Sequence, residues 1–147
     1  MEARERMAVA ACMAGLAFTR AAVGYVHAFA HQLGGLYHVP HGLANAIVMP
    51  HVLDFSKANC AKRLAELARV SGIGENGAND AELADAFIAQ IRSLNAEMQI
   101  PGVVKELKRD DFEKITDRAF AEAHGTYGIP RYMTRDDATA LLEKLLP

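Results

Sequence analysis

The sequence predicts an all-α fold, a helical bundle that forms one domain over residues 1–147. Apolar residues recur at helical spacing in several segments, and no segment alternates apolar and polar residues between hairpin turns. Proline is absent before Pro40, so no proline interrupts a long helical start. With 51% apolar and 23% charged residues, a chain of 147 residues is able to bury one sizeable core, which excludes intrinsic disorder.

The composition also narrows the choice of partners. The chain carries 16 Lys and Arg against 18 Asp and Glu, a formal net charge of −2, which argues against nucleic acid or an anionic membrane as a partner. The two cysteines, Cys12 and Cys60, have no metal-ligand spacing and suggest no disulfide framework. We therefore expect a protein of the reducing cytoplasm.

The first helical segment is long. Glu2–Leu33 is predicted to form one or two helices, bent near Gly15 or Gly24. Gly34 and Gly35 are predicted to stop it, since glycines often follow a helix end.

Within that segment, Met7–Thr19 is uncharged and rich in small residues. Glu2 and Glu5 spoil the basic start of a signal peptide, and Arg20 stands where a cleavage site would lie. The run is also shorter than the roughly 20 apolar residues of a membrane span. We therefore expect a buried helix that another helix approaches closely, and no membrane.

The later helices follow from apolar stripes and caps. Asp110 with Glu113, and Thr134 with Asp137, have the spacing of capping boxes that open helices. The apolar stripe with the clearest single face consists of Leu83, Phe87, Ile91, Leu94 and Met98. Helices are therefore predicted at Gly42–His51, Lys62–Val70 and Ala81–Met98, and after Asp110 and Thr134.

Histidines are concentrated in one part of the chain. The six are His27, His31, His38, His41, His51 and His124. His27 and His31 lie four apart, which places both rings on one helix face, as in helices that present two imidazoles to a metal. His41 follows a proline-fixed turn that is able to fold back and supply a third nitrogen. The spacing alone leaves open a metal site and a simple polar rim, and His38, His51 and His124 are expected at the surface or in supporting positions.

Other chemistries have weaker signals. The zinc-protease helix needs Glu directly after its first His, and Ala28 stands there. The sequence has neither a dinucleotide-binding GxGxxG motif nor a phosphate-binding GxxxxGK[ST] loop. Ser56 and Ser71 lack a glycine elbow, and Cys60 has no activating neighbour in the sequence.

Two adjacent motifs resemble a known family. Residues 24–35, GYVHAFAHQLGG, and residues 39–46, VPHGLANA, look like the signature of the iron-containing (group III) alcohol dehydrogenases. The family pattern is G-x-x-H-x-x-A-H-x-x-G-x, a short spacer and P-H-G-x-x-N-A. Residues 49–53, 100–102 and 127–133 resemble further family segments, so the resemblance covers nearly the whole chain.

The resemblance implies a metal-binding, all-helical C-terminal domain, which in the family faces an N-terminal α/β domain that binds nicotinamide. One divalent metal is held there by an Asp and three His, and two of those positions match His27 and His41. The position of His31 faces nicotinamide and substrate instead and helps with proton movement, although spacing alone would make it a ligand; here the interpretation follows the resemblance. Phe18 falls near the substrate pocket, and a core role for it is equally open.

The chain departs from the family pattern at its start. No His precedes His27, and only Glu2 and Glu5 are acidic there, so the Asp-x-x-x-His pair and the glycine-rich loop are missing. We therefore expect the C-terminal part of an alcohol dehydrogenase that uses iron or zinc and NAD or NADP to transfer hydride between an alcohol and its aldehyde. Alone it is expected to be inactive and, with its apolar helix uncovered, to form a homo-oligomer. The alternatives are a free-standing helical metal-binding or interaction module, and a bundle whose histidines are simply packed.

Overall fold

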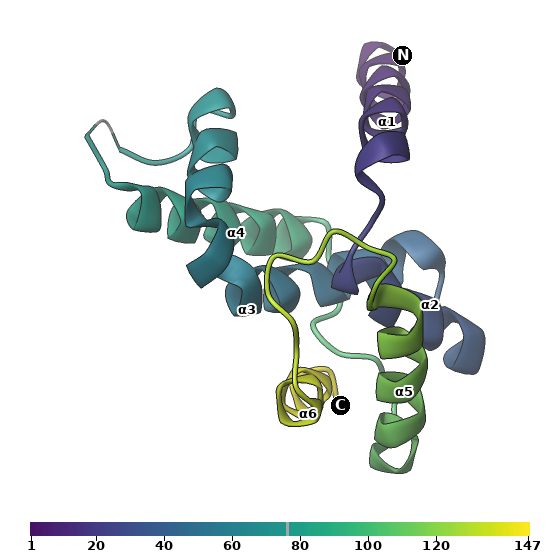
Figure 1. Ribbon diagram of the computed structural model, residues 1–147. Coiled ribbons are helices and arrows are strands. Elements are labelled where there is room, and N and C mark those ends of the chain that lie inside the picture. The colour runs from purple at the N-terminus through teal and green to yellow at the C-terminus, as the bar shows by residue number, and fades with distance from the viewer. Residues whose placement is uncertain (76) are drawn as a thin grey trace.

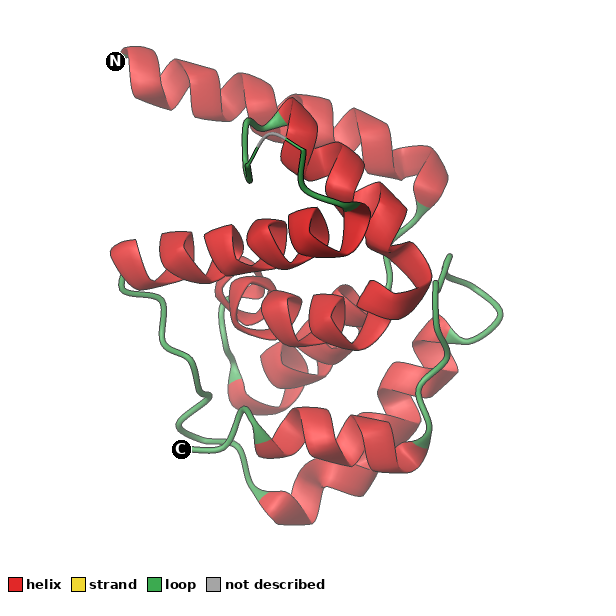
Figure 2. Ribbon diagram, turned by 90° about the vertical axis from the view of Figure 1, so that its left-hand side faces the viewer, coloured by secondary structure: helices red, strands yellow, loops and turns green. Residues whose placement is uncertain are grey.

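The computed structural model describes residues 1–75 and 77–147, and this part of the chain holds six α-helices, one short 3-10 helix and no strand. The predicted all-α fold is confirmed, as Figure 2 shows for the described residues. In chain order (Figure 1) the elements are α1 (Glu2–Ala21), α2 (Tyr25–Tyr37), α3 (His41–Val70), α4 (Asp80–Glu97), the 3-10 helix η1 (Arg109–Asp111), α5 (Phe112–Ala123) and α6 (Arg135–Glu143).

The break between α1 and α2 lies at Gly24, one of the two predicted positions, and the two helices are bent by 108°. Gly15 stays inside α1. The expected burial of Met7–Thr19 is wrong for this chain, because α1 has no buried residue and stands away from the other helices in Figure 1. No single described helix is long and apolar enough to cross a membrane; α1 and α2 meet that test only when joined across their bend.

The predicted stop at Gly34 and Gly35 is also wrong, because α2 continues through both to Tyr37. The helix ends where His38 adopts the left-handed conformation (φ 57°) and its N–H donates to the carbonyl of Gly34 at 3.0 Å. Gly34 has a packing role instead, since a Cβ there would lie 3.4 Å from the Val39 carbonyl oxygen.

Helix α3 joins two predicted helices into one of 30 residues that passes through Pro50. Proline has no N–H to donate to the carbonyl four residues earlier, here that of Ala46. The Asn95 side chain from α4 donates to that carbonyl at 2.8 Å instead, so the interruption is repaired by a neighbouring helix. A kink at Cys60 (φ −134°) marks the boundary that the sequence placed between two separate helices.

Helix α4 packs along α3 through the first part of its predicted stripe only. Asn79 and Glu82 form a capping box at its start. Leu83 is buried and Phe87 is partly buried against α3, whereas Leu94 and Met98, at the far end of the stripe, are 44% and 61% exposed. Ile88, which lies outside the predicted stripe, is buried as well. The stripe therefore extends beyond the partner helix that buries its first half.

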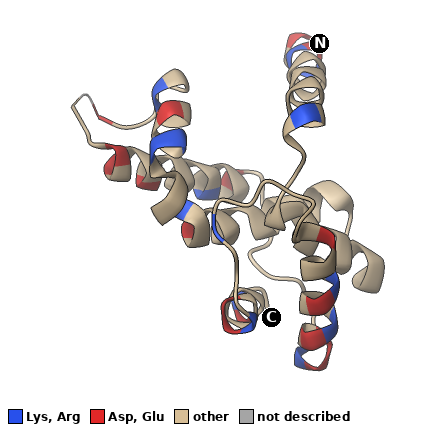
Figure 3. Ribbon diagram, viewed as in Figure 1, with Lys and Arg blue, Asp and Glu red and all other residues tan. Residues whose placement is uncertain are grey.

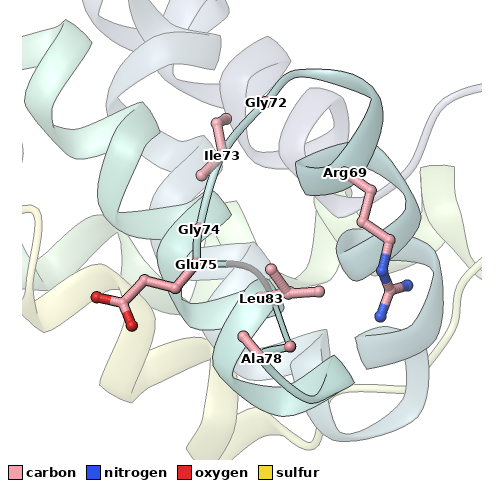
Figure 4. Close-up of a pocket in the computed structure, with 8 residues that line it drawn as sticks. Arg69, Gly72, Ile73, Gly74, Glu75, Ala78 and Leu83 are labelled. Atoms are coloured by element: carbon pink, nitrogen blue, oxygen red, sulfur yellow. The ribbon is translucent and has the colours of Figure 1, made fainter.

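A shallow pocket lies beside the connection from α3 to α4, and Figure 4 shows its lining residues. Gly74 has φ +90°, a backbone conformation that favours glycine, and a Cβ there would lie 2.5 Å from Cδ2 of Leu83 and displace that side chain. Arg69 at the pocket wall pairs with Asp80 at 2.6 Å. No histidine lines this pocket, which separates it from the histidine-rich segment.

The main core joins α2, the first half of α3, α5 and α6. The predicted box at Asp110 is wrong: Asp111 precedes α5 without a side-chain cap, and its carboxylate accepts a hydrogen bond from the Tyr37 hydroxyl at 2.6 Å. The box of Thr134 with Asp137 is confirmed. The inward residues of α5 and the C-terminal segment are buried, namely Phe112, Ile115, Ala119, Leu141, Leu142 and Leu145.

Candidate metal centre

Helix α2 presents two imidazoles on the side opposite its buried face. Phe29 and Leu33 are fully buried in the main core and fix the rotation of the helix. His27 and His31 then lie on the other side, with ring centroids 5.7 Å apart and planes inclined by 72°. The predicted shared face of these two histidines is therefore present.

His41 is brought to the same place by the turn between α2 and α3. The left-handed His38 ends α2, Pro40 stands at the start of α3, and His41 is the first residue of that helix. The His41 ring centroid lies 5.3 Å from the centroids of both His27 and His31. The fold-back expected of the proline turn thus places three imidazoles in one cluster.

Phe18 borders this cluster from α1. Its ring centroid lies 6.5 Å from that of His27, at an interplanar angle of 44°. Phe18 is 50% exposed, so the ring is not part of the main core in this chain. An aromatic ring beside His27 with a free face is available to contact a small apolar group.

The spacing of the rings agrees with the geometry of a shared metal ion. Imidazoles that bind one ion through nitrogens at about 2.1 Å, with a tetrahedral angle between them, have centroids about 5 Å apart. Among residues 1–75 and 77–147, however, no group of three His, Cys, Asp or Glu side chains is arranged to hold a metal. The ring spacing of the cluster is therefore that of imidazoles sharing an ion, but the described residues do not form a complete metal site.

The surroundings of the cluster contain few charges. No Lys, Arg, Asp or Glu occurs between Arg20 and Asp54, and α2 is free of all four residue types in Figure 3. The pKa of His27 is lowered from 6.5, first by burial and then by His41 and His31, with Glu122 acting in the opposite direction. A lowered pKa favours the neutral imidazole, which is the form that ligates metals.

Glu122 of α5 is a carboxylate that sequence reasoning missed. One of its oxygens lies 2.6 Å from Nδ1 of His31 and accepts from the Tyr127 hydroxyl at 2.8 Å. The other oxygen accepts from Nε2 of Gln32 at 3.2 Å. Because Glu122 lies three residues after Ala119 on the buried stripe of α5, a carboxylate at an inward position is the signal that would have found it.

Asn45 supports His41 from one turn along α3. Its Nδ2 donates to the His41 carbonyl at 2.8 Å and lies 3.2 Å from Nε2 of His41. Asn45 is buried, and its Oδ1 has no hydrogen-bond partner among the described residues. A ligand group that donates a hydrogen bond would satisfy this atom.

The other three histidines lie outside the cluster, as expected. His38 caps α2, and His51 is half-buried beside a shallow pocket that Asp54 and Lys144 also line. Nε2 of His124 lies 2.6 Å from the Tyr25 hydroxyl.

Residues 1–146 match the model of the Fe-containing alcohol dehydrogenase family, C-terminal. The chain belongs to the iron-containing alcohol dehydrogenase family. This membership confirms the resemblance carried by residues 24–35 and 39–46. A C-terminal match also agrees with the all-helical fold.

Members of the iron-containing alcohol dehydrogenase family resemble this chain over nearly its whole length. The NADPH-dependent butanol dehydrogenase of Clostridium saccharobutylicum is 36% identical over 97% of the chain and 37% of its own length. The 1,3-propanediol dehydrogenase of Klebsiella pneumoniae is 36% identical over 98% of the chain and 38% of its own length. A crystal structure of 1,3-propanediol oxidoreductase superposes with a TM-score of 0.90 at 35% identity, over 98% of the chain and 38% of that protein. The chain thus spans under two fifths of these relatives.

Proposed function

We propose that this chain forms the helical, metal-binding part of an alcohol dehydrogenase that transfers hydride between an alcohol or aldehyde and NAD or NADP. One observation carries the proposal: the turn from α2 to α3 sets the rings of His27 and His41 5.3 Å apart in a segment without charged side chains. Membership in the iron-containing alcohol dehydrogenase family supports the same chemistry. The related butanol and 1,3-propanediol dehydrogenases indicate small alcohols as the substrate class.

His27 and His41 are the proposed ligands of a divalent metal, iron or zinc. Burial lowers the pKa of His27, which keeps its ring in the neutral, ligating form. His41 starts α3, and the Asn45 side chain beside it restricts its ring. A divalent metal bound there supplies Lewis-acid chemistry, polarising an alcohol or aldehyde oxygen.

His31 is proposed to face nicotinamide and substrate rather than to bind the metal. Its side chain is 40% exposed, and its Nδ1 is already engaged by Glu122. Nε2 is the remaining nitrogen of the ring, and at the proposed site it accepts or returns a proton at the substrate oxygen. Phe18 is proposed to line the substrate pocket beside His27, where its ring excludes water from one side.

Two imidazoles do not complete a catalytic site, which uses at least three protein ligands. We propose that the further donors, the Asp and His of the family pattern, lie on an earlier helix of a longer chain. The nicotinamide-binding loop then comes from an N-terminal cofactor-binding domain, which agrees with the 37% and 38% of the relatives that the chain spans. The 147 residues alone are then without alcohol dehydrogenase activity. The proposal also includes a cytoplasmic location and a homo-oligomeric state, the latter supported by the uncovered apolar helix α1.

The ligand assignment is tested by titrating the ¹⁵N-labelled chain with Co²⁺ and following the ring signals of all six histidines by NMR. We expect weak binding of Co²⁺ with paramagnetic shifts at His27 and His41. In His27→Ala the shift at His41 should be lost, and in His41→Ala the shift at His27 should be lost. His38→Asn is the matched control, because it removes an imidazole outside the cluster and Asn tolerates the left-handed conformation at that position. Equal broadening of all histidines, or unchanged shifts at His41 in His27→Ala, would show that the assignment is wrong.

A further inference from the structure

Glu122 is the carboxylate that contacts the three-histidine cluster from another helix. It lies on α5, 91 residues from His31, and its side chain is 25% exposed. Three side chains meet it: Nδ1 of His31 at 2.6 Å, the Tyr127 hydroxyl at 2.8 Å and Nε2 of Gln32 at 3.2 Å. The proposed metal ligands, His27 and His41, do not explain why three side chains contact Glu122, and the packing of the core does not explain it either.

The chemistry of these partners settles which atom of His31 carries hydrogen. A carboxylate only accepts hydrogen bonds, and the Gln32 amide nitrogen and the Tyr127 hydroxyl both donate to it. Nδ1 of His31 must then be the donor in the bond at 2.6 Å. In a neutral imidazole one nitrogen holds the hydrogen and the other holds the lone pair, so the lone pair of His31 is on Nε2.

A purely structural role for Glu122 is a poor explanation of this arrangement. Helices α2 and α5 already pack through the main core, in which Phe29, Ile115 and Ala119 are fully buried. A partly exposed hydrogen bond between a neutral imidazole and a carboxylate contributes little to stability by comparison with such a core. The bonds from Tyr127 and Gln32 orient both carboxylate oxygens, as is common for groups that fix the tautomer and direction of a functional histidine.

We propose that Glu122 is the positioning residue of His31: it holds the Nδ1–H tautomer and thereby presents Nε2 as the acceptor of the ring. This inference rests on the proposed function in one respect, namely that His31 faces nicotinamide and substrate. The acceptor at Nε2 is the form of the ring that receives a hydrogen bond from a substrate hydroxyl. The Nε2–H tautomer would offer a donor at the same place instead.

The tautomer is measured directly in the ¹⁵N-histidine-labelled chain by two-bond ¹H–¹⁵N correlation, at about pH 8, where an unperturbed imidazole is neutral. We expect His31 in the native chain to be wholly Nδ1–H, although imidazole in water favours Nε2–H. In Glu122→Ala the Nδ1–H form should be lost to a mixture dominated by Nε2–H. In Glu122→Gln, whose amide oxygen still accepts, the Nδ1–H form should be kept.

Tyr127→Phe is the matched control, because it removes one donor from Glu122 but leaves the bond to His31. The Nδ1–H form of His31 should persist there, and unchanged signals of His51 should show that the fold is intact. An Nε2–H form in the native chain, or an unchanged His31 in folded Glu122→Ala, would overturn the proposal. The measurement needs neither metal nor substrate, so failure of the Co²⁺ titration at His27 and His41 would overturn the proposed function and not the role of Glu122.

Discussion

Replacing Tyr25 with Phe should destabilise the fold measurably, although it removes only one oxygen atom. Tyr25 is the first residue of α2 and is 3% exposed. Its hydroxyl accepts from the N–H of Met133 at 3.0 Å and lies 2.6 Å from Nε2 of His124. With these two contacts the hydroxyl ties the segment before α6 to the helix that carries His27.

The magnitude follows from what each partner loses. Met133 is 4% exposed, so its N–H has no water to replace the phenol, and an unsatisfied buried group costs about 1–3 kcal/mol. The bond to His124 is partly buried and adds about 1 kcal/mol. We expect Tyr25→Phe to lower the free energy of unfolding by about 2–4 kcal/mol, which for a chain of this size lowers Tm by roughly 5–15 °C.

Urea unfolding followed by circular dichroism measures this change. Tyr132→Phe is the matched control, because Tyr132 is 59% exposed and the loss of its hydroxyl should change the free energy of unfolding by less than about 0.5 kcal/mol. If Tyr25→Phe is as stable as Tyr132→Phe, the hydroxyl does not satisfy the Met133 N–H, and the explanation of how the C-terminal segment is held is wrong.

Two further predictions concern pH and association. The pKa of His51 is lowered from 6.5, first by burial and then by nearby cations. Neutral His51 therefore contributes to the free energy of unfolding above about pH 6.5, and this contribution is lost as the pH falls and the ring is protonated. His51→Gln should therefore make the fall in unfolding free energy between about pH 6.5 and 5 shallower in urea titrations, and a slope equal to that of the native chain would contradict this. Met13 and Leu16 on α1 are 65% and 73% exposed, and a monomer rarely leaves such a surface uncovered. We expect a dimer in sedimentation equilibrium at micromolar concentration that Met13→Lys with Leu16→Lys dissociates, whereas Val70→Lys, at another exposed apolar position, leaves it intact.

Sequence patterns predicted the helices better than their ends. The box of Thr134 with Asp137 was identified correctly because both partners are local. The stop at Gly34 and Gly35 and the short, separate helix Gly42–His51 were predicted wrongly, because tertiary contacts decide both positions. Gly34 makes room for the Val39 carbonyl, and the carbonyl that Pro50 leaves free accepts a hydrogen bond from Asn95 of α4.

Burial of α1 was also predicted wrongly for this chain. The prediction rested on the apolar composition of the helix. Phe18 is 50% exposed and Met7 69% exposed, yet charged residues are confined to the two ends of α1 in Figure 3. A helix that is apolar on all sides is one that other elements usually cover. The sequence thus indicates that the surface of α1 needs to be covered, but it does not indicate whether other helices of the same chain cover it.

The sequence predicted those contacts of the candidate site that join residues close together in the chain. Four-residue spacing placed His27 and His31 on one face, and the turn at Pro40 indicated that His41 folds back, both of which the structure shows. The stripe of α5 indicates that Glu122 faces inward, but its contact with His31 could not be predicted from spacing, since 91 residues separate the two.

Ring spacing alone does not choose the ligands among the three imidazoles, because both His27 and His31 lie 5.3 Å from His41. The neighbours of each ring favour a choice. His31 is held through Nδ1 by a carboxylate, and its exposed ring has one free nitrogen directed by that bond. His27 has no hydrogen bond from a described side chain, and its pKa is lowered by burial, so it is a neutral ring without a competing partner. A ligand needs a free lone pair and little desolvation cost on binding, and this argument favours His27 over His31 as the ligand that α2 supplies beside His41.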